Sequence, residues 1–209
     1  MKISYAVTTH NEHKEIEQLI PFILEFKDDE DELVIIDDGS DHKTWAVFDK
    51  YIHDKSNNIN FVERGFNGDF SVHKNFMMSQ CSGDWIFNLD ADEIPHEILM
   101  LNAKNFIKAN PIIELFWVPR WNTVEGITEE HAKRWGWNVD GLGRINWPDP
   151  QQRLWKNESH IKWQRRVHER LTGPTHDTTL PFEEDYCIYH HKTINKQEEQ
   201  NAHYERLMR

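Results

Sequence analysis

The chain has 209 residues, of which 38% are hydrophobic and 12% aromatic, so it is long and apolar enough to bury a sizeable core. This composition excludes a disordered chain, and no apolar run approaches the roughly 18 residues of a membrane-spanning helix. The first residues lack the basic and apolar segments of a secretory signal, so we expect a cytoplasmic protein. The only two cysteines, Cys81 and Cys187, are expected to be buried thiols.

The formal net charge of -12 argues against a general nucleic-acid-binding protein. The negative charge lies in residues 1–110, which have 10 basic and 21 acidic side chains. Residues 111–209 have 14 basic and 15 acidic side chains. Within the second half, residues 153–170 have six basic and two acidic side chains, which predicts an anion-binding surface. Seven of the nine tryptophans lie between Trp117 and Trp163 and suggest a stacking platform, although core packing explains about half of them equally well.

The first half of the chain alternates strand-length apolar runs with amphipathic stretches, which predicts βαβ units and a mostly parallel sheet flanked by helices. Pro21 is expected to kink or break the first helix, and Gly83 to end the third. The predicted strands are 3–8, 33–36, 59–63 and 85–89, and the predicted helices are 12–26, 44–51, 70–81 and 95–109.

The second half has a weaker pattern. A strand is expected over 112–118, and a second over 186–189, followed by a polar helix from about residue 195 to the end. Residues 120–150 show no periodicity and are interpreted as a functional lid or acceptor loop. We therefore expect a single α/β domain over residues 1–209.

Acidic and metal-binding residue types follow three of the predicted strands. The first strand ends at Thr8 to Glu12, the second at Asp37 and Asp38, and the fourth at Asp90-Ala91-Asp92-Glu93. In open parallel sheets, ligands bind beyond the carboxyl ends of the strands. Carboxylates gathered there repel one another unless a cation such as Mg²⁺ or Mn²⁺ compensates them. A solvated turn or a helix-capping cluster is the alternative interpretation.

Three sequence blocks resemble glycosyltransferase family 2, namely residues 4–12 (SYAVTTHNE), 34–40 (VIIDDGS) and 83–93 (GDWIFNLDADE). The resemblance is specific over about residues 1–110. It is looser over residues 147–154, Val167-His168-Glu169 and His190, which are similar to the branch that contains lipopolysaccharide-core glucosyltransferases. The resemblance implies a GT-A fold, with residues 1–110 as the half that binds a nucleotide-sugar and 111–209 as the half that binds the acceptor.

The resemblance also implies roles for individual residues in binding a UDP- or GDP-sugar and a Mn²⁺ or Mg²⁺ ion. Asp37 or Asp38 contacts the base, Asp90 lies near the ribose, and Asp92 ligates the metal. His190 completes the metal shell, with His191 as the alternative. The remaining expected donor-binding residues are Thr8, Asn11, Glu12, Lys74 and Arg153. For Lys74 the alternative is an exposed helix lysine, and for Arg153 a solvated basic face.

Direct displacement at a sugar carbon needs a base that takes the proton of the acceptor hydroxyl. Glu169 is our first candidate and Asp149 the second, although either carboxylate could instead be a surface partner of the nearby arginines. By resemblance, the reaction inverts the anomeric centre.

The acceptor is expected to be a surface glycan, and the alternative is a hydroxymethylated pyrimidine in DNA, as proposed for some viral family members. A non-catalytic module that binds nucleotides or sugars is a further alternative. A nucleotidyltransferase is disfavoured because no glycine-rich loop follows the first strand. The sequence does not determine the sugar, the linkage or the oligomeric state.

Overall fold

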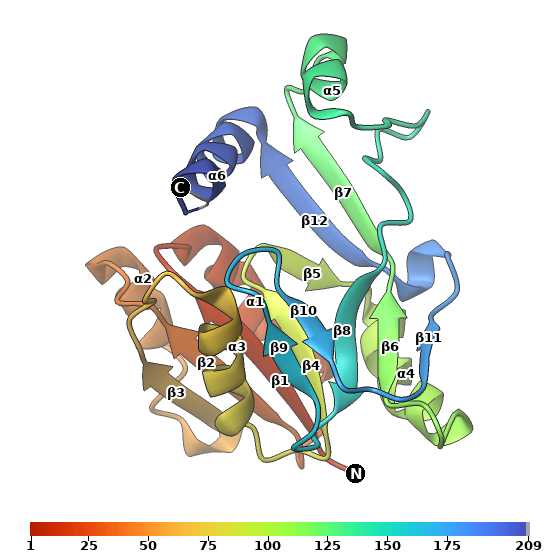
Figure 1. Ribbon diagram of the computed structural model, residues 1–209. Coiled ribbons are helices and arrows are strands. Elements are labelled where there is room, and N and C mark those ends of the chain that lie inside the picture. The colour runs from red at the N-terminus through yellow and green to blue at the C-terminus, as the bar shows by residue number, and fades with distance from the viewer. Residues whose placement is uncertain (208–209) are drawn as a thin grey trace.

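The computed structural model describes residues 1–207 and is built around a mixed, mainly parallel sheet of seven strands (Figure 1). Strands β1, β2, β3 and β4 are mutually parallel, whereas β8 runs antiparallel between β4 and β6. From edge to edge the sheet contains β11 (Asp177–Thr179), β6 (Leu115–Val118), β8 (Gln151–Lys156), β4 (Trp85–Asp90), β1 (Ile3–Thr9), β2 (Glu32–Asp37) and β3 (Ile59–Glu63).

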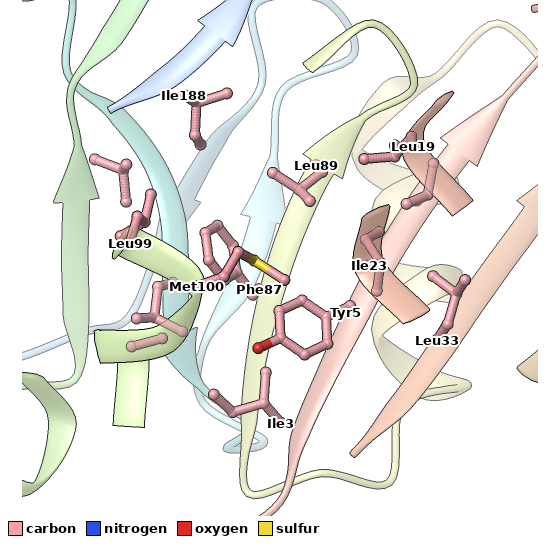
Figure 2. Close-up of a cluster of buried hydrophobic side chains, with 14 of the residues drawn as sticks. Ile3, Tyr5, Leu19, Ile23, Leu33, Phe87, Leu89, Leu99, Met100 and Ile188 are labelled. Carbon is pink, nitrogen blue, oxygen red and sulfur yellow. The ribbon is translucent and has the colours of Figure 1, made fainter. Parts of the chain in front are cut away.

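The two faces of this sheet bury separate apolar clusters, because side chains alternate between the faces along each strand. Ile3, Tyr5 and Val7 pack with α1 (His13–Phe26), α2 (His42–Phe48) and α4 (Glu97–Ala109). Figure 2 shows part of this cluster, with Tyr5, Phe87 and Met100 close together. On the opposite face, Ala6 belongs to a cluster with residues of α3 (Phe70–Ser79) and of the hairpin β9 (Lys162–Gln164) and β10 (Arg170–Thr172).

A second, three-stranded sheet lies at the end of the molecule where β1 and β4 end (Figure 1). It consists of β5 (Glu93–Pro95), β12 (Ile188–Thr193) and β7 (Arg120–Glu125), with β12 in the centre. Helix α5 (Glu129–Trp135) follows β7, and α6 (Ile194–Leu207) follows β12 directly. Two short 3₁₀ turns, η1 (Lys55–Asn57) and η2 (Glu184–Tyr186), complete the elements. Within residues 1–207, no helix has the length and apolarity needed to cross a membrane.

The predicted α/β class with a GT-A-like sheet is confirmed, and the predicted elements of residues 1–110 all exist. Several details differ from the prediction. Helix α1 is continuous from His13 to Phe26, so it does not break at Pro21. Helix α3 ends at Ser79, before the expected stop at Gly83, and Pro95 belongs to β5 while α4 begins two residues later.

The larger corrections concern residues 111–209. Residues 120–150 are not a structureless loop, since they contain β7 and α5. Strand β12 begins later and extends further than expected, so His190 and His191 lie within it and not after it. The helix expected from residue 195 is α6, although residues 208–209 lie outside the described part. Strands β6, β8 and β11 join the same sheet as β1 to β4, so the two expected halves are interwoven.

Candidate functional site

A polar cavity of about 730 Å³ lies between the ends of β1 and β4, the sheet of β7 and β12, and helix α6. Eight residues predicted from the sequence line it, namely Thr8, Glu12, Lys74, Asp90, Asp92, Asp149, Glu169 and His190. A second cavity of about 510 Å³ adjoins it and shares Lys74, Asp90, Asp149 and Glu169. Arg153 lines this second cavity. The structure therefore brings together residues from both halves of the sequence.

The turn that follows β4 is fixed by a buried network around Glu93, whose side chain is fully buried. The carboxylate of Glu93 accepts the backbone N–H of Asp90 at 3.0 Å and a hydrogen bond from Arg153 Nη2 at 2.7 Å. Arg153 Nη2 also donates to Asp90 Oδ2 at 2.5 Å. Burial raises the pKa of Asp90, but Arg153 and Lys74 more than offset this and hold it below its ordinary value.

Asp92 lies on the other side of the same turn, with its side chain 10% exposed. Its Oδ1 is 3.5 Å from Nε2 of His190, because the register of β12 places His190 opposite Glu93. Burial raises the pKa of Asp92, but the positive charges of Lys192 and Lys196 lower it, and the pKa lies well below its ordinary value. Asp92 is therefore ionised at neutral pH.

The hydrogen-bond network assigns the tautomer of His190. Asn122 donates its Nδ2 to Asp149 Oδ2 at 2.7 Å, so its Oδ1 accepts Nδ1–H of His190, also at 2.7 Å. Burial lowers the pKa of His190, so the ring is neutral at pH 7. A neutral ring that donates from Nδ1 turns the lone pair of Nε2 toward Asp92, and two acceptors then face each other at 3.5 Å.

This pair fits a divalent cation in its chemistry, because a carboxylate oxygen and an imidazole nitrogen oriented from behind by an amide are typical ligands. Within residues 1–207, no group of three or more His, Cys, Asp or Glu side chains could hold a metal ion. Mg²⁺ and Mn²⁺ are commonly bound through one or two protein groups, with substrate phosphates and water as the other ligands. The pair thus suits a cation that arrives with a phosphate.

Two lysines lie close to Oδ2, the second carboxylate oxygen of Asp92. Lys192 Nζ is 3.4 Å and Lys196 Nζ is 3.3 Å from Asp92 Oδ2. Lys196 also contacts Glu15 at 3.0 Å and Glu12 at 3.6 Å. Burial, together with the charge of Asp92, raises the pKa of Glu12 from 4.5 to about 7. The sequence analysis missed both lysines, although strand alternation puts Lys192 on the same face as His190.

Glu169 and Lys74 form an ion pair between the two cavities. Lys74 Nζ is 2.7 Å from Glu169 Oε1, 3.9 Å from Asp90 Oδ1 and 4.5 Å from the ring centre of Trp163. The side chains of Lys74 and Glu169 are 9% and 16% exposed, respectively. Lys74 is therefore not the exposed helix lysine that was the alternative interpretation.

The carboxylate of Asp149 is held from several sides. Its Oδ2 accepts two hydrogen bonds from Arg120, at 3.0 and 2.8 Å, and one from Asn122. Its Oδ1 accepts a hydrogen bond from Gln151 at 3.0 Å. This arrangement leaves Asp149 less available for proton transfer than Glu169. Arg120, which also contacts Glu93 at 3.2 Å, was not identified from the sequence, since no motif marks it.

Four predicted site residues line neither of the two cavities, namely Asn11, Asp37, Asp38 and His191. Asp37 is fully buried and accepts the backbone N–H of Ser40, while Asp38 accepts that of Phe66. Asn11 accepts the backbone N–H of Asp41. His191 is exposed and contacts Thr123 on the face of β12 opposite to His190, so His190 is the histidine beside Asp92.

The tryptophans divide between core and site. Trp155 and Trp163 are buried in the core cluster beneath α3. Trp117 lines the second cavity and Trp137 the first. Trp121 packs against Trp147, with their ring centres 5.6 Å apart. The tryptophan-rich segment therefore contributes one indole, Trp137, to the wall of the larger cavity.

Comparisons with known proteins agree with this architecture. The sequence model of "Glycosyl transferase family 2" matches residues 4–194. The lipopolysaccharide core biosynthesis glycosyltransferase LpsC of Rhizobium meliloti (strain 1021) is 42% identical over 62 residues, which are 30% of this chain and 22% of LpsC. This short match agrees with the resemblance to the lipopolysaccharide-core branch.

Solved structures of other glycosyltransferases share the fold at low sequence identity. A fragment of S. aureus TarS in complex with UDP superposes with a TM-score of 0.65 and 17% identity, over 91% of this chain and 60% of that one. The mannosyltransferase PcManGT of Pyrobaculum calidifontis, in complex with GDP-Man and Mn²⁺, superposes with a TM-score of 0.50 and 19% sequence identity. The match covers 68% of this chain and 49% of PcManGT. The chain thus spans less than two thirds of the length of these relatives. Because the family match covers nearly all of its residues, the chain belongs to glycosyltransferase family 2 and has the GT-A fold.

Proposed function

We propose that the chain transfers a sugar from a nucleotide-sugar to an acceptor hydroxyl. The observation that supports this most is that Asp90, Asp92, Glu169 and His190 converge on one cavity in a member of glycosyltransferase family 2. The relatives named above were solved with UDP, or with GDP-Man and Mn²⁺, so a UDP- or GDP-sugar is the proposed donor.

In this proposal the nucleotide lies along the ends of β1, β2 and β4. Thr8, Glu12, Lys74 and Asp90 line the cavity, which supports their assignment to donor binding. Asp90 contacts the ribose and Lys74 the phosphates. The family pattern further assigns Asp37 or Asp38 to the base and Asn11 to the adjoining loop. Arg153 acts by holding Asp90 in place, since its guanidinium already bonds to Asp90 and Glu93.

Asp92 and His190 are the proposed holders of a Mn²⁺ or Mg²⁺ ion. Such an ion, when bound, stabilises the negative charge that develops on the departing diphosphate. The residues of the chain prepare this position: Asn122 fixes the tautomer of His190, and the turn held by Glu93 aims Asp92 into the cavity. Substitution of Asn122 would therefore loosen His190 without removing either proposed ligand.

Glu169 is the proposed base. The acceptor oxygen attacks the anomeric carbon, the bond from that carbon to the diphosphate oxygen breaks, and the acceptor proton moves to the carboxylate of Glu169. One such displacement inverts the anomeric configuration. The ion pair with Lys74 supports this role, because it orients the carboxylate at the junction of the two cavities.

A hydroxyl of a glycan is the proposed acceptor. The indole of Trp137 at the cavity wall suits stacking on a sugar ring, and the LpsC match involves a protein of lipopolysaccharide core biosynthesis. A modified DNA acceptor predicts a steep loss of binding between low and physiological salt, whereas binding of a neutral glycan predicts little change. Binding measured at two salt concentrations therefore separates the two acceptors.

The decisive experiment is a panel of UDP- and GDP-sugars incubated with the protein, Mn²⁺ and glycan acceptors, with release of nucleoside diphosphate as the readout. We expect release with at least one donor and its loss in Asp92→Ala. Asp29→Ala is the matched control, because Asp29 belongs to another Asp-x-Asp sequence but is exposed. Donor binding without release would favour a binding module, and full activity of Asp92→Ala would refute the assignment.

A further inference from the structure

Lys192 and Lys196 place two ammonium groups beside Asp92, outside the three sequence blocks that resemble the family. Lys192 lies on β12, two residues after His190, and Lys196 lies in the first turn of α6. Both line the larger cavity together with Asp92. The side chain of Lys192 is only 5% exposed. A buried ammonium group is costly to desolvate and requires a compensating anion.

The compensation that Lys192 receives is incomplete. Among the described residues, Asp92 is its sole ion-pair partner, and the distance of 3.4 Å exceeds the usual range of a hydrogen bond. It shares this carboxylate oxygen with Lys196, at 3.3 Å. Its one close contact is to a neutral group, the amide oxygen of Gln200 at 2.7 Å. Lys196 is better compensated, since Glu15 lies 3.0 Å and Glu12 3.6 Å from its Nζ, so the shortfall of negative charge is greatest at Lys192.

Lys104 shows what a structural lysine looks like in the same protein. Its Nζ lies 2.7 Å from Asp28, 3.0 Å from Glu30 and 2.8 Å from Asp31. Lys104 is more exposed than Lys192, at 15%, and yet it has three close carboxylates. The contrast indicates that Lys192 has capacity for a further anion, and the cavity gives that anion access.

We propose, on the basis of the proposed function, that Lys192 and Lys196 are ligands of the donor diphosphate and bind it from the side of Asp92 opposite to His190. Ammonium groups form short, charge-assisted hydrogen bonds with phosphate oxygens. These bonds do not depend on a metal ion. A nucleoside diphosphate therefore binds the chelator-treated protein with an affinity that the two lysines set, and a divalent cation at Asp92 adds to it.

Calorimetric titration with UDP and with GDP, in EDTA and in Mn²⁺, tests this inference on the intact chain. For whichever nucleotide binds, Lys192→Met weakens binding in EDTA by about 10- to 100-fold, as expected for loss of a hydrogen bond between charged groups. Lys196→Met weakens it in the same direction. Asp92→Ala shows the converse, since it loses the gain from Mn²⁺ but retains binding in EDTA. Lys133→Met, on exposed α5, is the control and leaves both affinities unchanged.

The corresponding nucleoside monophosphate separates contact with the diphosphate from a structural effect. Lys192→Met changes its binding less than about twofold if the lysine contacts the second phosphate, whereas a distorted cavity weakens both nucleotides equally. Three outcomes would each overturn this inference but not the proposed function. Lys192→Met could weaken binding of the monophosphate and the diphosphate equally, or leave diphosphate binding unchanged. Alternatively, the wild type could bind no nucleotide in EDTA and bind it only with Mn²⁺. If no nucleotide binds the wild type even with Mn²⁺, the proposed function itself fails.

Discussion

Asp90 and Asp92 are separated by one residue and yet belong to regions of opposite character. The Asp90 network consists of Asp90, Glu93, Arg120, Asp149 and Arg153, and its members contact one another at 2.5 to 3.2 Å. In the Asp92 cluster, which consists of Asp92, His190, Lys192 and Lys196, the contacts to the carboxylate of Asp92 are 3.3 to 3.5 Å long.

Because their contact distances differ, we expect the two regions to respond differently when a ligand binds. A charged pair at 2.7 Å is already satisfied, and removing one partner strands the other. Groups about 3.4 Å apart are not in close hydrogen-bond contact, so each can still bind an ion or a phosphate oxygen that lies beside them. The Asp90 network therefore holds the turn in shape, while the Asp92 cluster has capacity for charge that the ligand brings.

The largest effect is expected for Arg153→Met, in the Asp90 network. The substitution leaves Asp90 and the fully buried Glu93 without their closest cation, and we expect a loss of about 3–5 kcal/mol in the free energy of unfolding. Urea unfolding followed by fluorescence measures it. Arg165→Met, at an exposed position, should stay within about 0.5 kcal/mol of the wild type. A loss below about 1 kcal/mol for Arg153→Met would show that the network is not structural.

Glu169→Gln removes the proposed base but keeps an oxygen that can accept a hydrogen bond from Lys74. Loss of a general base lowers kcat by about 100- to 1000-fold, while the affinity for the donor stays within about twofold of the wild type. Steady-state kinetics with the active donor, together with calorimetric donor binding, provide both numbers. Normal turnover of this variant would place the base elsewhere.

Asp149→Asn distinguishes the second candidate base from a structural carboxylate. Its four hydrogen bonds come from side-chain donors, so an amide nitrogen in place of one oxygen opposes at least one of them. We expect a loss of about 2 kcal/mol in unfolding free energy, with kcat within about tenfold of the wild type below the melting range. Because Asp149 has a φ of 39°, where Asn is also accommodated, the substitution tests the carboxylate and not the backbone. A drop in kcat with unchanged stability would instead favour Asp149 as the base.

The two regions also differ in how far the sequence predicted them. Asp90 and Asp92 were identified because β4 is apolar from Trp85 to Leu89 apart from Asn88, and its end is visible in the sequence. Arg120 and Lys192 were missed because long-range pairing brings them to the site. Residues opposite each other across β12 and β7 are about 70 positions apart in the chain, and no local pattern reports that register.

The same cause explains the errors in the second half. Strand β8 has the sequence QQRLWK, without clean alternation, and it is stabilised by antiparallel partners on both sides. Segment 120–150 lacked periodicity because β7 is partly exposed and α5 has no buried residue. By contrast, His190 was found through its resemblance to a late histidine of the family, and the alternation of β12 places His190, and not His191, beside Asp92.

The smallest expected effect concerns Glu12, at the margin of the Asp92 cluster. Its pKa is raised from 4.5 to about 7 in the folded protein, by burial and by the charge of Asp92. The folded state therefore binds more protons than the unfolded state between these values, and this carboxyl group makes stability fall as pH rises from about 4.5 to about 7. Glu12→Gln removes that contribution. Since the side chain is 24% exposed, we expect a gain of about 1 kcal/mol in the free energy of unfolding at pH 8 and almost none at pH 4.

Urea unfolding at the two pH values measures this gain. Glu25→Gln, exposed on α1, is the control and should differ from the wild type by the same amount at both pH values. A destabilised Glu12→Gln at pH 8 would mean that the ion pair with Lys196 outweighs the repulsion from Asp92, and that the cluster is more tightly paired than its distances indicate.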